Sequence, residues 1–174
     1  MRDWVVATPD IVGLFEFLYW QRDRVLAMAA ELSPAAFVDP EPAVYRDLRS
    51  TLVHELDVER SWRLRLQGQP KAVWDVTLDA ADYPDVATLA DAWQREEADT
   101  LAWLTDLTVE ALSTPVAANG LEGYSLATYL VHVVMHGIES VSAAAILLHR
   151  TGHSVGDVGF LDYADASGGP ATSL

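Results

Sequence analysis

The amino-acid sequence predicts an all-α fold: a four-helix bundle with a long crossover loop between the second and third helices. Four long stretches of the chain repeat apolar residues every three to four positions, which is the period of one face of an α-helix. Proline and glycine are concentrated between these stretches, where helices begin and end. The 174 residues are enough for one domain with a sizeable core. We expect a single helical domain over residues 1–165 and a flexible tail over residues 166–174.

The first predicted helix runs from about Thr8 to Leu32. Thr8-Pro9-Asp10 is typical of a helix start, because it combines a cap residue, an early proline and an acidic first turn. Arg22 falls on the apolar face of this helix, where another apolar residue is due. Its side chain either extends out of the bundle, which is the commoner behaviour, or points into a polar pocket. Residues 33–37 are predicted to form a short capped turn.

The second predicted helix runs from about Tyr45 to Gln67, and Gly68 closes it. Glu59 falls on its apolar face, where a charge is costly unless it is paired. His54 lies at the edge of the same face and, taken alone, is interpreted as a partly buried structural histidine. The apolar residues that define the face recur at helical spacing: Leu48, Leu52, Leu56, Trp62 and Leu66.

Residues 69–85 show no helical period and form the long link to the third helix. Trp74 and Tyr83 are expected to hold this link against the body, and short strands within residues 73–78 are an alternative. The third helix is predicted to begin at Asp85 or Thr88 and to end near residue 107. A single capped turn is predicted to follow it, over residues 108–112.

The fourth predicted helix, Ser125 to Arg150, carries two neighbouring apolar stripes and is therefore expected to be the central element. His132 and His136 are four residues apart on one of its faces, a spacing at which two imidazoles can bind one metal ion. Two histidines on a buried helix can equally be core residues with hydrogen-bond partners. A membrane span is disfavoured, because Glu139 and both histidines interrupt the apolar run. Beyond this helix, the segment from residue 153 is expected to dock through its tyrosine at position 163, before a mobile end.

The composition excludes several classes of function. The formal net charge of −15 disfavours nucleic-acid binding, because phosphate backbones would be repelled. The chain has no cysteine, so a metal ion would need histidine, carboxylate or water ligands. Its first ten residues lack the apolar core of a secretory signal. We therefore expect a cytoplasmic protein that acts on neither nucleic acid nor membrane.

Three segments together resemble the DinB-like family, which includes the YfiT-like metal-dependent hydrolases, over about residues 5–165. In the second helix the family shows a histidine followed by glutamate and tryptophan, similar to HELDVERSW over residues 54–62. In the fourth helix the family shows a motif similar to HVVNHGTHHRGQ. The corresponding stretch of this chain is HVVMHGIESVSA, over residues 132–143. The closing glycine–aspartate and aromatic–aspartate pairs resemble GHSVGD at 152–157 and FLDY at 160–163.

The resemblance implies a metal ion held by three histidines, one from the second helix and two from the fourth. Matched by position, the first two are His54 and His136, and the third position is Ser140. Because serine is a poor metal ligand, three arrangements of the site are open. His132 takes the third place, Glu139 reaches the ion, or the site holds no metal and its histidines bond to each other, to the serine or to water.

Family membership implies two alternative functions. The first is a metal-dependent S-transferase using a mycothiol- or bacillithiol-type thiol, or a hydrolase, acting on a small molecule; Zn or Ni is the expected ion. Mycothiol-dependent maleylpyruvate isomerases are relatives of this kind. Arg22, Glu59 and Trp62 are expected to line the pocket. The alternative is a metal-free protein, either a binder of small ligands or a dimeric stress-related protein. In both cases His54 must face His136 across the bundle, and a homodimer is expected.

Overall fold

The computed structural model describes residues 7–40, 46–121 and 123–168, and within these ranges it contains helices and no strand. The all-α prediction is confirmed. Four helices are long: α1 (Thr8–Ala29), α3 (Leu48–Leu66), α5 (Val86–Thr105) and α7 (Leu126–Arg150). The others are short turns of helix: α2 (Pro34–Phe37), α4 (Lys71–Trp74), η1 (Ala80–Asp82), α6 (Val109–Ser113) and α8 (Phe160–Ala166).

Side-chain caps fix where several of these helices begin. Asp47, Asp85 and Ser125 each accept a hydrogen bond from a backbone N–H in the first turn of α3, α5 and α7. The structure thus selects Asp85 rather than Thr88 as the start of the third long helix. Tyr45, the predicted first residue of the second long helix, lies outside the described residues.

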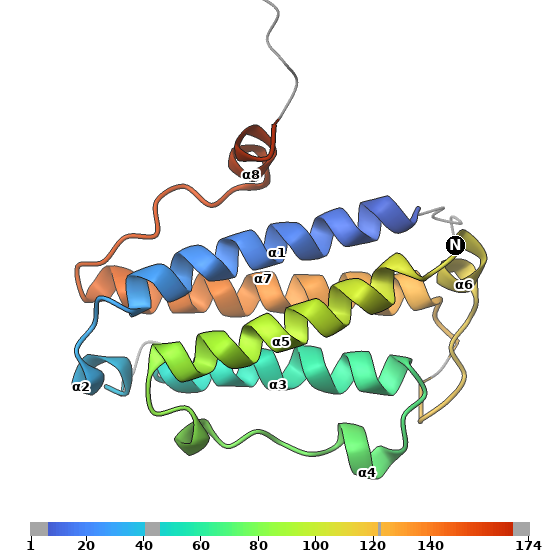
Figure 1. The fold of residues 1–174 in the computed structure, drawn as a ribbon, viewed down its shortest axis with the longest axis horizontal. Helices are drawn as coiled ribbons and strands as arrows, with labels where there is room; N and C mark the ends of the chain where they lie inside the picture. The colour runs from blue at the N-terminus through green and yellow to red at the C-terminus, as the bar shows by residue number, and fades with distance from the viewer. Residues whose placement is uncertain (1–6, 41–45, 122, 169–174) are drawn as a thin grey trace, which may run out of the picture.

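The four long helices pack side by side around one core, with α7 against α1 and α3, and α5 against α1 (Figure 1). The link between α3 and α5 runs back along the length of α3, so these two helices point in the same direction (Figure 1). It contains α4 and η1, so the alternative of short strands is wrong. The Asp57 carboxylate accepts from the Leu78 N–H, and the Ser61 hydroxyl donates to the Trp74 carbonyl. These bonds hold the link against α3.

Helix α7 supplies a large part of the core, as its two apolar stripes predict. Leu130, Val133, Ala144 and Leu148 are each no more than 2% exposed. By length and composition alone α7 could cross a membrane, and it is the one described helix of which this is true. The central helix of a soluble protein has the same composition, and α7 packs against two partners along its length.

The segment after α7 docks on α1 through aromatic side chains, as predicted. Tyr163 packs against Phe17 and Trp20, with ring centroids 5.6 and 5.8 Å apart. The Gln21 side chain also donates to the carbonyl of Val158 at 2.6 Å. Helix α8 therefore lies against the outer side of α1, away from α3 and α5 (Figure 1). Residues 169–174, where the mobile end was predicted, lie outside the described residues.

Candidate functional site

The structure brings His54 of α3 and His136 of α7 together. Their ring centroids are 5.4 Å apart and the rings meet edge to face. Both side chains line a cavity of about 190 Å³, with Glu139 and Ser140 of α7 and Arg46 before α3. The remaining lining residues are Thr51 and Ala143. This volume accommodates a small group of atoms rather than a drug-sized molecule.

A buried carboxylate orients one of the two histidines. Glu55 is only 2% exposed, and its Oε2 lies 2.7 Å from Nδ1 of His136. Gly137 makes this approach possible, because a Cβ at that position would lie 2.9 Å from Oε1 of Glu55 and 2.5 Å from Leu18. Glu55 was not predicted from the sequence. The available signal was a second glutamate four residues before Glu59 on the buried side of the same helix.

The two imidazoles have pKa values shifted in opposite directions. The hydrogen bond to Glu55 raises the pKa of His136, against the opposing effect of burial. Burial lowers the pKa of His54, and the positive charges of Arg46 and His136 lower it further. Burial also raises the pKa of Glu55, although the bond to His136 works against that shift. As the pH falls, His136 takes up a proton before His54, so the cavity combines a proton donor with a proton acceptor.

The described residues do not provide the three-ligand metal site that the family resemblance implies. No group of three histidine, aspartate or glutamate side chains in this part of the chain is arranged to hold an ion. His132 is exposed and packs against Trp62, with ring centroids 5.3 Å apart, and it does not line the histidine cavity. Glu139 lines the cavity and Ser140 occupies the third position. The residues therefore fit a two-histidine arrangement and not a three-histidine centre.

The three predicted pocket residues lie in three different places. Trp62 packs between His132 and Tyr129 on the outer side of the α3–α7 contact. Glu59 is 1% exposed and lies in the core. Arg22 is 2% exposed, so the expectation that it extends out of the bundle is wrong. The Arg22 guanidinium lies over the rings of Tyr19 and Trp93 and bonds to Asp23 and Glu97. These contacts compensate its positive charge where the side chain is buried.

Glu59 is bonded to neutral groups. Its Oε1 accepts from the Tyr19 hydroxyl at 2.5 Å and from the Thr100 hydroxyl at 3.3 Å. Burial raises its pKa to about 8, and the negative charges of Glu55 and Glu96 contribute to the increase. Glu59 is therefore mostly protonated at neutral pH, which explains how it is tolerated on an apolar face.

A sequence model of the DinB family matches residues 7–172, which is nearly the whole chain. A search of curated proteins found no match.

Proposed function

Since the chain belongs to the DinB family, we propose that it binds a small carboxylate-bearing molecule in the His54–His136 cavity without a three-histidine metal centre. The observation that carries this proposal is the 2.7 Å contact between Glu55 Oε2 and His136 Nδ1. With Nδ1 held by the carboxylate, Nε2 is the ring nitrogen that remains for a ligand.

Charge and size both favour a small anion. The bond to Glu55 raises the pKa of His136, so this ring carries positive charge at a higher pH than a free imidazole. Arg46 adds a second positive charge to the lining, Glu139 adds one negative charge, and Thr51 and Ser140 bring hydroxyl groups. His54, whose pKa is lowered, stays neutral to a lower pH than a free imidazole, and its ring N–H can donate to the carboxylate. A short carboxylate matches these groups and the 190 Å³ of space.

Propionate is a suitable probe of this site. In imidazole ¹H–¹⁵N spectra we expect saturable shifts of the His54 and His136 resonances and an increase in the His136 pKa on propionate binding. His136→Gln should abolish the propionate-induced shift of the His54 resonances, whereas His149→Gln, which changes an exposed histidine later on α7, should preserve it. Equal responses in the two variants would refute the proposal.

The second candidate function is the metal-dependent thiol S-transferase or hydrolase reaction of the family resemblance. One observation favours it: metal-binding histidines typically bond their other nitrogen to a carboxylate, as His136 bonds to Glu55. Glu139 lines the cavity, and its side chain would have to move toward the two histidines to become the third ligand. A low-molecular-weight thiol would be the co-substrate.

Metal analysis of the protein purified without a histidine tag separates the two candidates. The first predicts less than about 0.2 metal ion per chain, well below stoichiometric ligation. A stoichiometric Zn or Ni ion that is lost in both His54→Ala and His136→Ala would establish the second candidate and exclude the first.

A homodimer is part of this proposal. Met135 and Ile146 are more than half exposed on the outer side of α7, and burial of such side chains favours association. Light scattering coupled to size exclusion should give twice the chain mass, and Met135→Glu should shift the population toward the single chain.

A further inference from the structure

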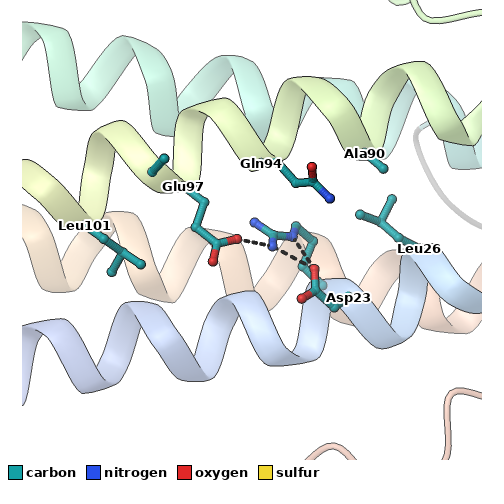
Figure 2. A pocket seen from close by; sticks show the side chains of 8 residues that line it. Asp23, Leu26, Ala90, Gln94, Glu97 and Leu101 are labelled. Atoms are coloured by element: carbon teal, nitrogen blue, oxygen red, sulfur yellow. Dashed lines mark hydrogen bonds and ion pairs between the residues drawn. The ribbon is translucent and has the colours of Figure 1, made fainter.

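A second cavity lies between α1 and α5, away from the two histidines. Its volume is about 450 Å³, within the range of small-molecule sites. Figure 2 shows its lining, with Asp23 and Leu26 from α1 facing Gln94, Glu97 and Leu101 from α5. Together with Ala90 and Ala98, the two leucines give this cavity an apolar surface beside its polar groups.

The guanidinium of Arg22 forms part of the lining and is incompletely bonded. Its Nη2 donates to Asp23 Oδ1 at 2.7 Å and to Glu97 Oε2 at 2.5 Å, and its Nε donates to Asp23 Oδ1 at 3.1 Å. The third nitrogen, Nη1, is buried and has no hydrogen-bond partner in the described part of the chain. A buried donor without an acceptor is costly, so a carbonyl oxygen brought to Nη1 gains more than it would at an exposed arginine.

Gln94 is the side chain best placed to give access to Arg22. It is exposed, and Figure 2 shows it extending from α5 into the space between the two helices. No hydrogen bond fixes its amide within the residues that the structure describes. Because Gln94 lines the same cavity as Arg22, its side chain can change rotamer to admit a ligand without loss of a hydrogen bond.

We propose that this cavity binds an uncharged amide or lactam with a short apolar body. The Arg22–Glu97 pair presents a donor next to an acceptor, which is the complement of the C=O and N–H of one amide. The ligand carbonyl accepts from Nη1 of Arg22, its N–H donates to the Glu97 carboxylate, and its apolar body lies against Leu26 and Leu101.

Charge selects against other ligands. Asp23 and Glu97 already compensate the single positive charge of Arg22 and leave the lining with one excess negative charge. A carboxylate ligand would therefore be repelled, in contrast to the His54–His136 cavity. An alkylammonium ion would find the carboxylates but would leave Nη1 without an acceptor. A neutral amide is not repelled by the carboxylates and supplies an acceptor for Nη1 of Arg22.

The test uses 2-pyrrolidinone as the probe, followed in ¹H–¹⁵N spectra of the full chain. We expect saturable millimolar binding with shifts at the Gln94 side-chain amide and the Arg22 Nε–H. N-methyl-2-pyrrolidinone lacks the N–H and should bind at least about tenfold more weakly, because the hydrogen bond from the ligand to the Glu97 carboxylate can no longer form. Propionate should leave these resonances unchanged.

Two alanines of α5 provide a matched pair of variants. Ala98 is exposed and lines the cavity, so Ala98→Leu should fill the space and abolish the 2-pyrrolidinone response. Ala102 is exposed one turn later outside the cavity, and Ala102→Leu should bind as the unmodified chain does. Unchanged binding in Ala98→Leu, equal binding of the N-methyl compound, or no saturable response would each overturn the proposal. The result is independent of the His54–His136 site, which is tested with propionate.

Discussion

Two glutamates on one face of α3 have the same chemistry and nearly the same burial, yet the structure gives them different states. Glu55 and Glu59 are 2% and 1% exposed, and each is one helical turn from the other. Glu55 meets an imidazole from α7, whereas Glu59 meets the hydroxyls of Tyr19 and Thr100. Burial raises the pKa of both carboxyls, but only Glu55 has a partner that becomes positively charged.

This difference shows that the partner, rather than the depth, decides what a buried carboxyl does. Glu55 and His136 form a pair that can carry charge beside a cavity that opens to ligands. Glu59 has a pKa of about 8 and acts as a neutral hydrogen-bonding group inside the core. Four substitutions would test this contrast, and they follow from the largest expected effect to the smallest.

Glu59→Gln should have the largest effect, and the effect should depend on pH. The folded-state pKa of Glu59, about 8, lies above its ordinary value of 4.5, so the unmodified protein loses stability as the pH rises between these values. Glutamine keeps the acceptor for Tyr19 and cannot ionise. The free energy of unfolding of Glu59→Gln, relative to that of the unmodified chain, should therefore increase by several kcal/mol across this pH range, at about 1.4 kcal/mol per pKa unit.

Urea denaturation at pH 5, 7 and 9 measures this difference. Glu31→Gln, at an exposed position, controls for the loss of one carboxylate. A constant difference between Glu59→Gln and the unmodified chain over this range would show that Glu59 is charged in the folded protein.

Glu55→Gln should reduce stability by roughly 1.5 to 3 kcal/mol at pH 5, because a charge-assisted hydrogen bond to His136 is lost. The pKa of His136 is raised in the folded protein, so this stabilisation is complete below the ordinary histidine pKa and disappears as the pH rises through the raised value. The variant should also lower the His136 pKa in NMR titrations. Glu139→Gln, which removes a weaker charge effect, should lower it less; the reverse order would contradict the assigned pair.

Tyr19→Phe should cost roughly 1 to 2 kcal/mol, because a buried hydrogen bond is removed and Glu59 loses its closest donor. The Tyr19 bond lowers the Glu59 pKa, so its loss should raise that pKa and extend to higher pH the range over which stability declines. Tyr163→Phe is the matched control, since the Tyr163 hydroxyl lies 3.4 Å from Glu16 at an exposed site. Equal thermal stability of the two variants would contradict the role of Tyr19.

The smallest expected effect is the change that His136→Gln makes in the titration of His54. The positive charge of His136 lowers the pKa of His54, so its removal should raise the His54 pKa. The energy involved is under about 1 kcal/mol, because both rings are partly exposed and solvent screens the repulsion. An unchanged His54 titration would show that the two rings do not interact.

Most of the helices could be predicted from the sequence, because the signals that define a helix come from residues close together in the chain. The apolar period in α7 and the cap residues are local signals. They place the start of α7 at Ser125 and narrow the start of α5 to Asp85 or Thr88, of which the structure shows Asp85. The two histidines also came together as the family motifs implied. Of the two placements that the sequence left open for Arg22, the structure shows the one in a polar pocket. A local pattern could not decide this, because it cannot show that Glu97 from α5 reaches the same point.

By itself the sequence determined that α3 and α7 each bury one face and that His54 and His136 lie near those faces, because helical periodicity is a property of neighbouring residues. Only the tertiary structure decided which carboxyl meets which partner. The charge of a buried group depends on solvent exclusion and on atoms within a few ångströms, and the His136 ring, the Tyr19 hydroxyl and the Glu97 carboxylate come from distant parts of the chain. The same residue type is therefore the partner of a histidine at position 55 and a neutral core group at position 59.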